Sequence, residues 1–434
     1  MNSNEFAKRR KQLIRMVGED GIALLPSAPA KTRSRDVEYR YRQDSDFHYL
    51  TGFDEPDSVA VLAPGRASGE YIVFCRERNI DKERWDGYRA GPEGAVSKYG
   101  ADDAFPIDDI DDILPGIIES RSRVYYAMGA YSDFDARVAD WIKSLRSRGS
   151  SGAHTPHEFV ALDHLLHDMR LYKSRAEISS MRRSAKVAGA AHRRAMQQVR
   201  PGMFEYELEA EFIHEFRRAN ARYSYSPIVG GGANACILHY VENSEPLVDG
   251  DLVLIDAGCE LDYYASDITR TLPVNGRYSP EQRAVYDIVY EAQQAAIEKT
   301  CIGNQWNDPH DAAVRVITRG LKKLGLLDGT LARLLRDGAY REFFMHRTGH
   351  WIGLDVHDVG DYKVGDEWRL LESGMVTTVE PGIYISASSG AARRWQNIGV
   401  RIEDDVAVTK KGPDVLSKSL PGDADEIEKL MGAA

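Results

Sequence analysis

The pattern of apolar and polar positions divides the chain into two parts with different layouts. Between residue 5 and about residue 151, helical patterns alternate with four short apolar runs, at residues 22–25, 59–62, 71–74 and 124–127. This alternation is typical of an α/β layer domain. We therefore predict an α/β N-terminal domain at residues 1–168 and a second domain at residues 169–434.

The second part repeats one order of elements. Apolar residues at helical spacing predict helices, and short apolar runs between them predict strands. Two helices followed by a pair of strands occur twice, although the residue identities do not repeat. The predicted elements are helices at 176–199 and 205–218, strands at 252–257 and 268–274, helices at 281–299 and 311–324, and strands at 375–379 and 400–408.

Acidic residues occupy unusual positions on these strands. On the run 252–257, Asp256 shares its face with apolar residues, so its carboxylate points inward and is costly without a partner. On the run 400–408, Arg401 and Glu403 point to the same side, which would let Arg401 hold the orientation of Glu403. Strand parity alone leaves a solvent-facing charged edge as the alternative for this last run.

Three histidines favour a functional site over a solvent-facing charged edge. His346, His350 and His357 lie within twelve residues, with glycines between them, and the sequence Val379-Glu-Pro-Gly382 follows. This cluster favours a catalytic or metal-binding role for these histidines over ordinary core packing. The spacing of the first two histidines matches a zincin helix, but Arg347 stands where that motif has a glutamate, which argues against a zincin.

Charge and hydropathy exclude several kinds of partner. The 434 residues carry a formal net charge of −11, which argues against binding to nucleic acid or to an anionic membrane surface. No apolar run approaches the ~18 residues that would span a bilayer. The N-terminal region has no apolar segment long enough for a signal peptide. We therefore expect a cytoplasmic protein.

The motifs together resemble a known family. In order along the chain, they are similar to the successive signatures of the pita-bread metallopeptidases and, within them, of the bacterial aminopeptidase P (Xaa-Pro aminopeptidase) family. The resemblance implies an α+β pita-bread catalytic domain with a pseudo-twofold internal layout, preceded by the α/β N-terminal domain of that family. It rests on Leu254-Ile-Asp-Ala-Gly258, Ser266-Asp-Ile-Thr-Arg-Thr271, residues 346–353, Val379-Glu-Pro-Gly382, Gly399-Val-Arg-Ile-Glu-Asp404 and the N-terminal segment 39–53.

The resemblance implies a ligand set for two metal ions. Asp256 would bind one ion, His350 and Glu380 the other, and Asp267 and Glu403 would bridge them. Oxygen-rich ligation with one imidazole suits a fairly hard divalent ion, so Mn(II) is the first choice, with Co(II) and Zn(II) as alternatives. Two ions roughly 3.5 Å apart could share a water and lower its pKa.

The same resemblance implies roles beyond the ligands. Glu380 would take a proton from water and deliver it to the leaving proline nitrogen. His239 and His357 match positions that hydrogen-bond the substrate and the tetrahedral intermediate. His346 would line the pocket beside the proline ring.

Two aromatic residues complete the candidate site. Tyr362 follows the last histidine as it does in the family. Trp85 resembles a position from which the family's N-terminal domain reaches toward an active site, which can be that of a neighbouring subunit. The alternative is that Trp85 is an ordinary aromatic residue of the core or of an interface. We assign no role to Arg369, because the basic residue that the family has after this tyrosine does not stand at the expected position in this sequence.

The function implied by the resemblance is a dinuclear-metal aminopeptidase for peptides with proline at the second position, in a homodimer or homotetramer. A prolidase acting on Xaa-Pro dipeptides, a methionine aminopeptidase and a non-catalytic pita-bread module that binds proteins remain alternatives. The complete acidic set argues against the last of these, because a binding module has no reason to keep carboxylates that it must neutralise.

Overall fold

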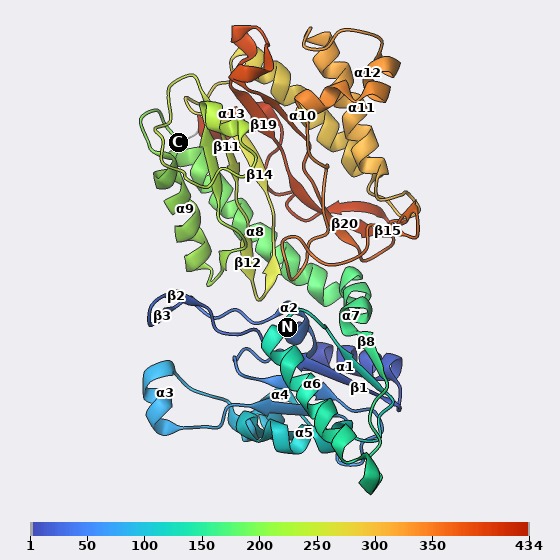
Figure 1. The fold of residues 1–434 in the computed structure, drawn as a ribbon. Helices are drawn as coiled ribbons and strands as arrows, with labels where there is room; N and C mark the ends of the chain where they lie inside the picture. The colour runs from blue at the N-terminus through green and yellow to red at the C-terminus, as the bar shows by residue number, and fades with distance from the viewer. Residues whose placement is uncertain (1–2, 433–434) are drawn as a thin grey trace. The chain divides into compact units, whose positions relative to one another are not determined.

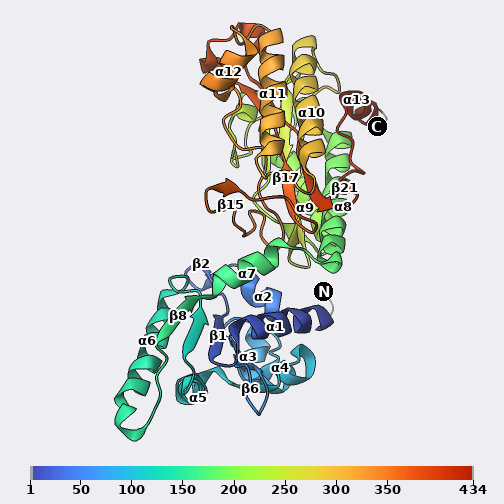
Figure 2. The same cartoon turned by 90° about the vertical axis from the view of Figure 1, so that its right-hand side faces the viewer.

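The computed structural model describes residues 3–432 and divides the chain into two compact units, Met1–Met169 and Arg170–Ala434. Each unit has its own sheets, which can be followed in Figures 1 and 2. Helix α7 (Leu162–Leu171) carries the chain from the first unit into the second. Among the described residues, no helix is both long enough and apolar enough to cross a membrane.

The first unit is built on a mixed six-stranded sheet with the order β6-β5-β4-β1-β7-β8. β4 is antiparallel to β1 and β5, and the other neighbouring strands are parallel. All four predicted apolar runs form strands, which confirms the α/β layer. The strands are β1 (Gly21–Pro26), β4 (Val59–Leu62), β5 (Tyr71–Cys75), β6 (Asp103–Pro106), β7 (Arg123–Tyr126) and β8 (Glu158–Ala161), with a short separate pair, β2 (Thr32–Ser34) and β3 (Val37–Glu38).

Helices α5 and α6 supply apolar residues to the core of this unit. Leu114 and Ile118 from α5 and Trp141 and Leu145 from α6 pack with Ile22 and the neighbouring strand residues in one buried cluster. The helix α3, in contrast, has no buried residue. The helices are α1 (Ser3–Val17), α2 (Ser45–Thr51), α3 (Ile80–Asp86), α4 (Gly91–Tyr99), α5 (Ile110–Ile118) and α6 (Ser132–Ser147).

The second unit has two halves with matching element order, as the sequence predicted. In each half two helices precede an antiparallel strand pair. Figure 2 shows α10 and α11 lying side by side along their length. The first half contains α8 (Arg175–Gln198), α9 (Glu205–Arg218), β11 (Leu252–Asp256) and β14 (Thr269–Pro273), and the second contains α10 (Pro280–Lys299), α11 (Asp308–Lys323), β17 (Val376–Val379) and β20 (Asp404–Thr409).

Local sequence fixes where the first helix of each half begins. The Ser174 side chain accepts from the backbone of Glu177 while the Glu177 side chain accepts from the backbone of Ser174, which is a capping box. Ser279 and Gln282 form the same arrangement before α10, where Pro280 takes the first helical position. These reciprocal bonds satisfy amide groups that the helix itself leaves without partners.

The prediction of one strand at 400–408 is wrong. The structure has two strands there, β19 (Ile398–Arg401), which pairs with β18 (Gly382–Ile385), and β20, which pairs with β17. The chain changes sheets at Ile402 and Glu403, and Glu403 forms an isolated bridge with Thr269. Arg401 ends β19 and Glu403 precedes β20, and the two residues nevertheless line one cavity, on the same side as predicted.

The connection between β11 and β14 is also more structured than expected. It contains β12 (Cys259–Leu261), which pairs with β13 (Tyr264–Ala265) and with β9 (Arg222–Tyr223). The remaining elements of the second unit are β10 (Ile228–Gly231), β15 (Lys363–Val364), β16 (Glu367–Trp368), β21 (Gly412–Val415), α12 (Leu331–Asp337) and α13 (Ala424–Met431).

Candidate metal centre

The acidic residues predicted as metal ligands lie at strand ends from both halves of the second unit. Asp256 is the last residue of β11, Asp267 lies two residues before β14, and Glu380 directly follows β17. Glu403 directly precedes β20, and its backbone N–H donates to the carbonyl of Thr269 at 3.1 Å. This bridge joins the two halves where the acids meet.

The five predicted ligand residues all line one cavity of about 460 Å³. Ligand atoms of Asp267, His350 and Glu403 lie within 4.8 Å of one another. Nε2 of His350 is 3.4 Å from Oδ2 of Asp267 and 3.8 Å from Oε1 of Glu380. Asp256 lies in the same cavity, so the structure brings the whole set together.

Backbone contacts orient His350 toward the acids. Its Nδ1 donates to the carbonyl of Trp351 at 3.0 Å, which leaves Nε2 facing Asp267. Its backbone pairs with Thr378, whose N–H donates to the carbonyl of His350 at 2.9 Å. Only glycine fits at position 349 beside this contact, because a Cβ there would lie 2.1 Å from the carbonyl oxygen of Thr378.

Burial and mutual repulsion make this cluster costly without a cation. Burial and the neighbouring acids raise the pKa of Glu380 to about 7, and the same two causes raise the pKa of Glu403 well above its usual value. Burial alone would lower the pKa of His350, but Asp267 and Glu380 raise it to about 9. Four carboxylates and one imidazole are a donor set that suits divalent cations, so these residues fit the metal centre that the sequence predicted.

Tyr225 contacts two of the acids and was not found from the sequence. Its hydroxyl lies at hydrogen-bond distance, 2.5 Å, from both Asp256 and Asp267. One phenolic proton can be donated to only one carboxylate at a time, so the other contact requires a proton on that acid, which then donates to the phenolic oxygen. The residue lies between β9 and β10 in the run Tyr223-Ser-Tyr-Ser-Pro227, where no pattern distinguishes it from an ordinary loop tyrosine.

We expect Tyr225→Phe to weaken metal binding without unfolding the protein. The substitution keeps the ring and removes only the hydroxyl that orients Asp256 and Asp267, and losing such an outer contact costs about 10- to 100-fold in metal affinity. Titration with Mn(II) measures the effect. Tyr223→Phe is the matched control, because Tyr223 is exposed on β9 and should leave the affinity unchanged. Equal affinities in the two variants would contradict the prediction.

Arg401 contacts a different acid from the one expected. Its Nη2 donates to Oδ2 of Asp256 at 2.7 Å, whereas Nε donates to the hydroxyl of Thr269 at 3.3 Å. Thr269 in turn donates to Oε2 of Glu403 at 2.6 Å. The arginine therefore pairs directly with Asp256 and reaches Glu403 as an outer contact, through Thr269.

A chain of hydrogen bonds fixes the tautomer of His346. Arg401 Nη1 donates to the hydroxyl oxygen of Tyr384 at 3.0 Å, and this hydroxyl lies 2.8 Å from Nε2 of His346. Nδ1 of His346 lies 2.7 Å from the carbonyl of Arg347, so Nδ1 donates and Nε2 accepts. Burial and the charge of Arg401 lower the pKa of His346 to about 3, which keeps the imidazole neutral.

His239 and His357 are exposed side chains that line the same cavity. The His357 ring lies 4.3 Å from the His350 ring in an edge-to-face arrangement. Partial burial of the ring, followed by the charge of His350, lowers the pKa of His357. Both histidines are therefore placed to donate or accept a hydrogen bond inside the cavity.

An aromatic wall forms another side of the cavity. Tyr362 lies 4.4 Å, centroid to centroid, from Trp306 and stacks on Trp351 with an interplanar angle of 7°. Its hydroxyl accepts from the backbone N–H of Trp351 at 3.2 Å. Trp306 and Trp368 also line the cavity, and neither was predicted as a site residue, because both lie outside the motifs.

Trp85 belongs to the first unit. It lies on α3, and its side chain is 87% exposed, next to Ile80 and Tyr88, which are exposed as well. A core role for Trp85 is therefore excluded, and the other two expectations, an interface and a reach toward an active site, stay predictions.

Comparisons with known proteins cover both units. A model described as metallopeptidase family M24 matches residues 179–410, and one described as aminopeptidase P, N-terminal domain, matches residues 6–125. The chain is 44% identical to the Xaa-Pro aminopeptidase of Escherichia coli (strain K12), over 100% of this chain and 99% of that protein. It is 34% identical to human Xaa-Pro aminopeptidase 3, over 99% and 86%.

Solved structures show the same similarity in three dimensions. The Pseudomonas aeruginosa aminopeptidase PepP matches with a TM-score of 0.99 and 59% identity, over 100% of this chain and 98% of that one. A zinc-substituted E. coli aminopeptidase P in complex with product matches with a TM-score of 0.97 and 43% identity, over 100% and 99%. The chain therefore belongs to metallopeptidase family M24, as an aminopeptidase P with the pita-bread fold.

Proposed function

We propose that this chain is a metal-dependent aminopeptidase that hydrolyses the bond between an N-terminal residue and a following proline. The observation that carries the proposal is the convergence of four acids and His350 on one cavity, beside neutral histidines and an aromatic wall. The full-length similarity to proteins named Xaa-Pro aminopeptidases supports the choice of substrate. Residues 1–168 would form the N-terminal domain and residues 169–434 the catalytic domain.

Two divalent ions fit the donor set. Asp256 would hold one ion, His350 and Glu380 the other, and Asp267 and Glu403 both. Mn(II) is our first choice because carboxylate oxygens dominate the set, and Co(II) or Zn(II) could substitute. Such ions, when bound, polarise a carbonyl oxygen and lower the pKa of water.

The protein's own groups would handle the protons and hold the peptide. Glu380, which lines the cavity, would accept a proton from water and return it to the leaving proline nitrogen. His239 and His357 would hydrogen-bond the peptide carbonyls from the cavity rim. The neutral His346 would lie beside the proline ring, and Tyr362 would offer it an apolar surface.

Trp85 is proposed to act in an oligomer. Ile80 and Trp85 are large apolar residues exposed on α3, which has no buried residue, and such exposure is consistent with an interface. We propose a homodimer or homotetramer, in which Trp85 would reach the active site of a neighbouring subunit. We also propose a cytoplasmic location, because the sequence shows neither an apolar run long enough to span a bilayer nor a signal peptide.

A panel of four peptides tests the function. The Mn(II)-loaded protein should release the first residue from an Xaa-Pro-Xaa tripeptide, and should leave a matched peptide with alanine in place of proline largely intact. Cleavage of only an Xaa-Pro dipeptide would indicate a prolidase, and cleavage of only a Met-Ala peptide a methionine aminopeptidase. Failure to cleave any of them with metal bound would favour a binding module.

A further inference from the structure

A second cavity of about 570 Å³ lies behind the strands that carry the metal ligands. Successive side chains of a strand point to opposite faces. Thr269 on β14 contacts Glu403 in the metal cavity, and the next residue, Arg270, lines the second cavity. Likewise Glu403 lines the metal cavity and Asp404 the second one. The two cavities are therefore separated by the thickness of these strands.

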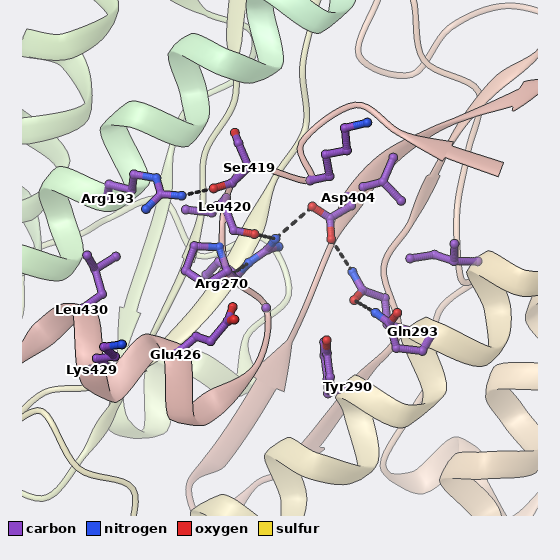
Figure 3. A pocket seen from close by; sticks show the side chains of 16 residues that line it. Arg193, Arg270, Tyr290, Gln293, Asp404, Ser419, Leu420, Glu426, Lys429 and Leu430 are labelled. Atoms are coloured by element: carbon purple, nitrogen blue, oxygen red, sulfur yellow. Dashed lines mark hydrogen bonds and ion pairs between the residues drawn. The ribbon is translucent and has the colours of Figure 1, made fainter.

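Arg270 forms the floor of the second cavity, as Figure 3 shows, and only 1% of the residue is exposed. Its Nη1 donates to the carbonyl of Thr269 at 2.8 Å and to the carbonyl of Glu403 at 2.7 Å. Nε donates to the carbonyl of Pro421 at 2.8 Å. The guanidinium thus joins the two residues of the isolated bridge at which the halves of this unit meet.

Asp404 holds the guanidinium in place. Its Oδ1 accepts from Nη2 of Arg270 at 2.9 Å and from the hydroxyl of Ser417, and its Oδ2 accepts from Nε2 of Gln293 at 2.8 Å. All these contacts are buried. Removing the guanidinium would take a donor from the carbonyls of Thr269, Glu403 and Pro421, and would leave a buried carboxylate without its cation.

We propose that Arg270 is a positioning residue for the metal centre, which holds Glu403 in place through its backbone from the far side of the strands. The proposal rests on the proposed role of Glu403 as a metal ligand. Arg270 contacts neither the ligand side chains nor the metal cavity. Its effect passes through the carbonyls of Thr269 and Glu403, and a lysine could not reproduce it, because a single ammonium cannot make the forked set of contacts.

The open cavity makes the proposal testable by chemical rescue. Arg270→Ala would remove the side chain down to Cβ and leave a space continuous with the second cavity, which guanidinium ions can enter. We expect this variant to bind Mn(II) about 10- to 100-fold more weakly than the wild type, since outer contacts of metal ligands have this size of effect. Guanidinium chloride at non-denaturing concentration should restore most of the affinity, and equal concentrations of sodium chloride or urea should not. Arg270→Lys should stay impaired.

Arg193→Ala is the matched control. Arg193 lines the same cavity, but its guanidinium donates to the carbonyl of Ser419, away from the bridge (Figure 3). This variant should bind Mn(II) as the wild type does and should not respond to guanidinium. Thermal melting of each full-length variant separates loss of metal binding from loss of fold.

Two results would overturn the proposal: a folded Arg270→Ala variant with wild-type Mn(II) affinity, or an impaired one that guanidinium does not restore. If Arg270→Ala does not fold, Asp404→Asn decides, since it weakens the hold on the guanidinium and keeps the shape. Reduced Mn(II) affinity in that variant supports the proposal, and wild-type affinity overturns it. Failure of the wild-type protein to bind Mn(II) would instead count against the proposed function.

Discussion

Asp267→Asn should abolish metal binding and peptidase activity together. Asp267 is 5% exposed, contacts Tyr225 and His350, and lies among the ligand atoms of Glu403. The amide keeps the size of the side chain but removes the charge that a divalent ion requires and offers one ligand oxygen in place of two. Activity on an Xaa-Pro-Xaa tripeptide should fall on the order of 10³-fold or more, because the electrostatic stabilisation of the reacting carbonyl is lost with the ions.

The experiment needs both metal content and kinetics. Metal content is measured on the purified variant after dialysis against Mn(II), and initial rates are measured at saturating peptide. Asp328→Asn is the matched control, since Asp328 is exposed in the loop before α12 and should behave as the wild type. Glu403→Ala should repeat the loss. An active variant free of metal would remove Asp267 from the ligand set.

Sequence patterns predicted the parts of this protein that local chemistry determines. The two helices and strand pair of each half follow from apolar spacing and from helix starts such as Ser174 and Ser279. The five ligand residues carry their signal within short motifs, and the structure brings them into one cavity. Asp256 in particular was marked by its inward position at the end of an apolar strand.

The contacts between motifs could not be predicted, because they depend on how distant segments pair. Strand parity placed Arg401 on the side of Glu403, where it lies, but its ion pair with Asp256 joins segments 145 positions apart. Tyr225 reaches two ligands from a loop that has no periodic pattern. The role proposed for Arg270 likewise depends on a carbonyl contributed from residue 403, more than a hundred positions away.

Removing the metal ions should make the stability of the protein fall as the pH rises from about 6.5 to 9, above the range in which histidines with lowered pKa values, such as His346, act in the opposite direction. The fold raises the pKa of Glu380 from 4.5 to about 7, so the stability that it contributes is complete below about pH 4.5 and is lost as the pH rises through 7. The fold also raises the pKa of His350 from 6.5 to about 9, so its contribution is complete below about pH 6.5 and is lost through pH 9. Both effects have the same sign, and Glu380 alone corresponds to about 3 kcal/mol.

Bound metal should remove this dependence. The ions compete with protons for the same oxygens and for Nε2 of His350, so they bind more tightly as the pH rises. Thermal melting with a chelator should therefore show a Tm that falls across this range. The difference between the Tm of the Mn(II)-loaded protein and the Tm in chelator should increase with pH. Glu380→Gln offers the control, because it removes one titrating group and should flatten the slope in chelator. If Tm depended on pH in the same way with and without metal, the ions would not be relieving repulsion among these buried acids. The raised pKa of Glu380 would then also have no effect on folding.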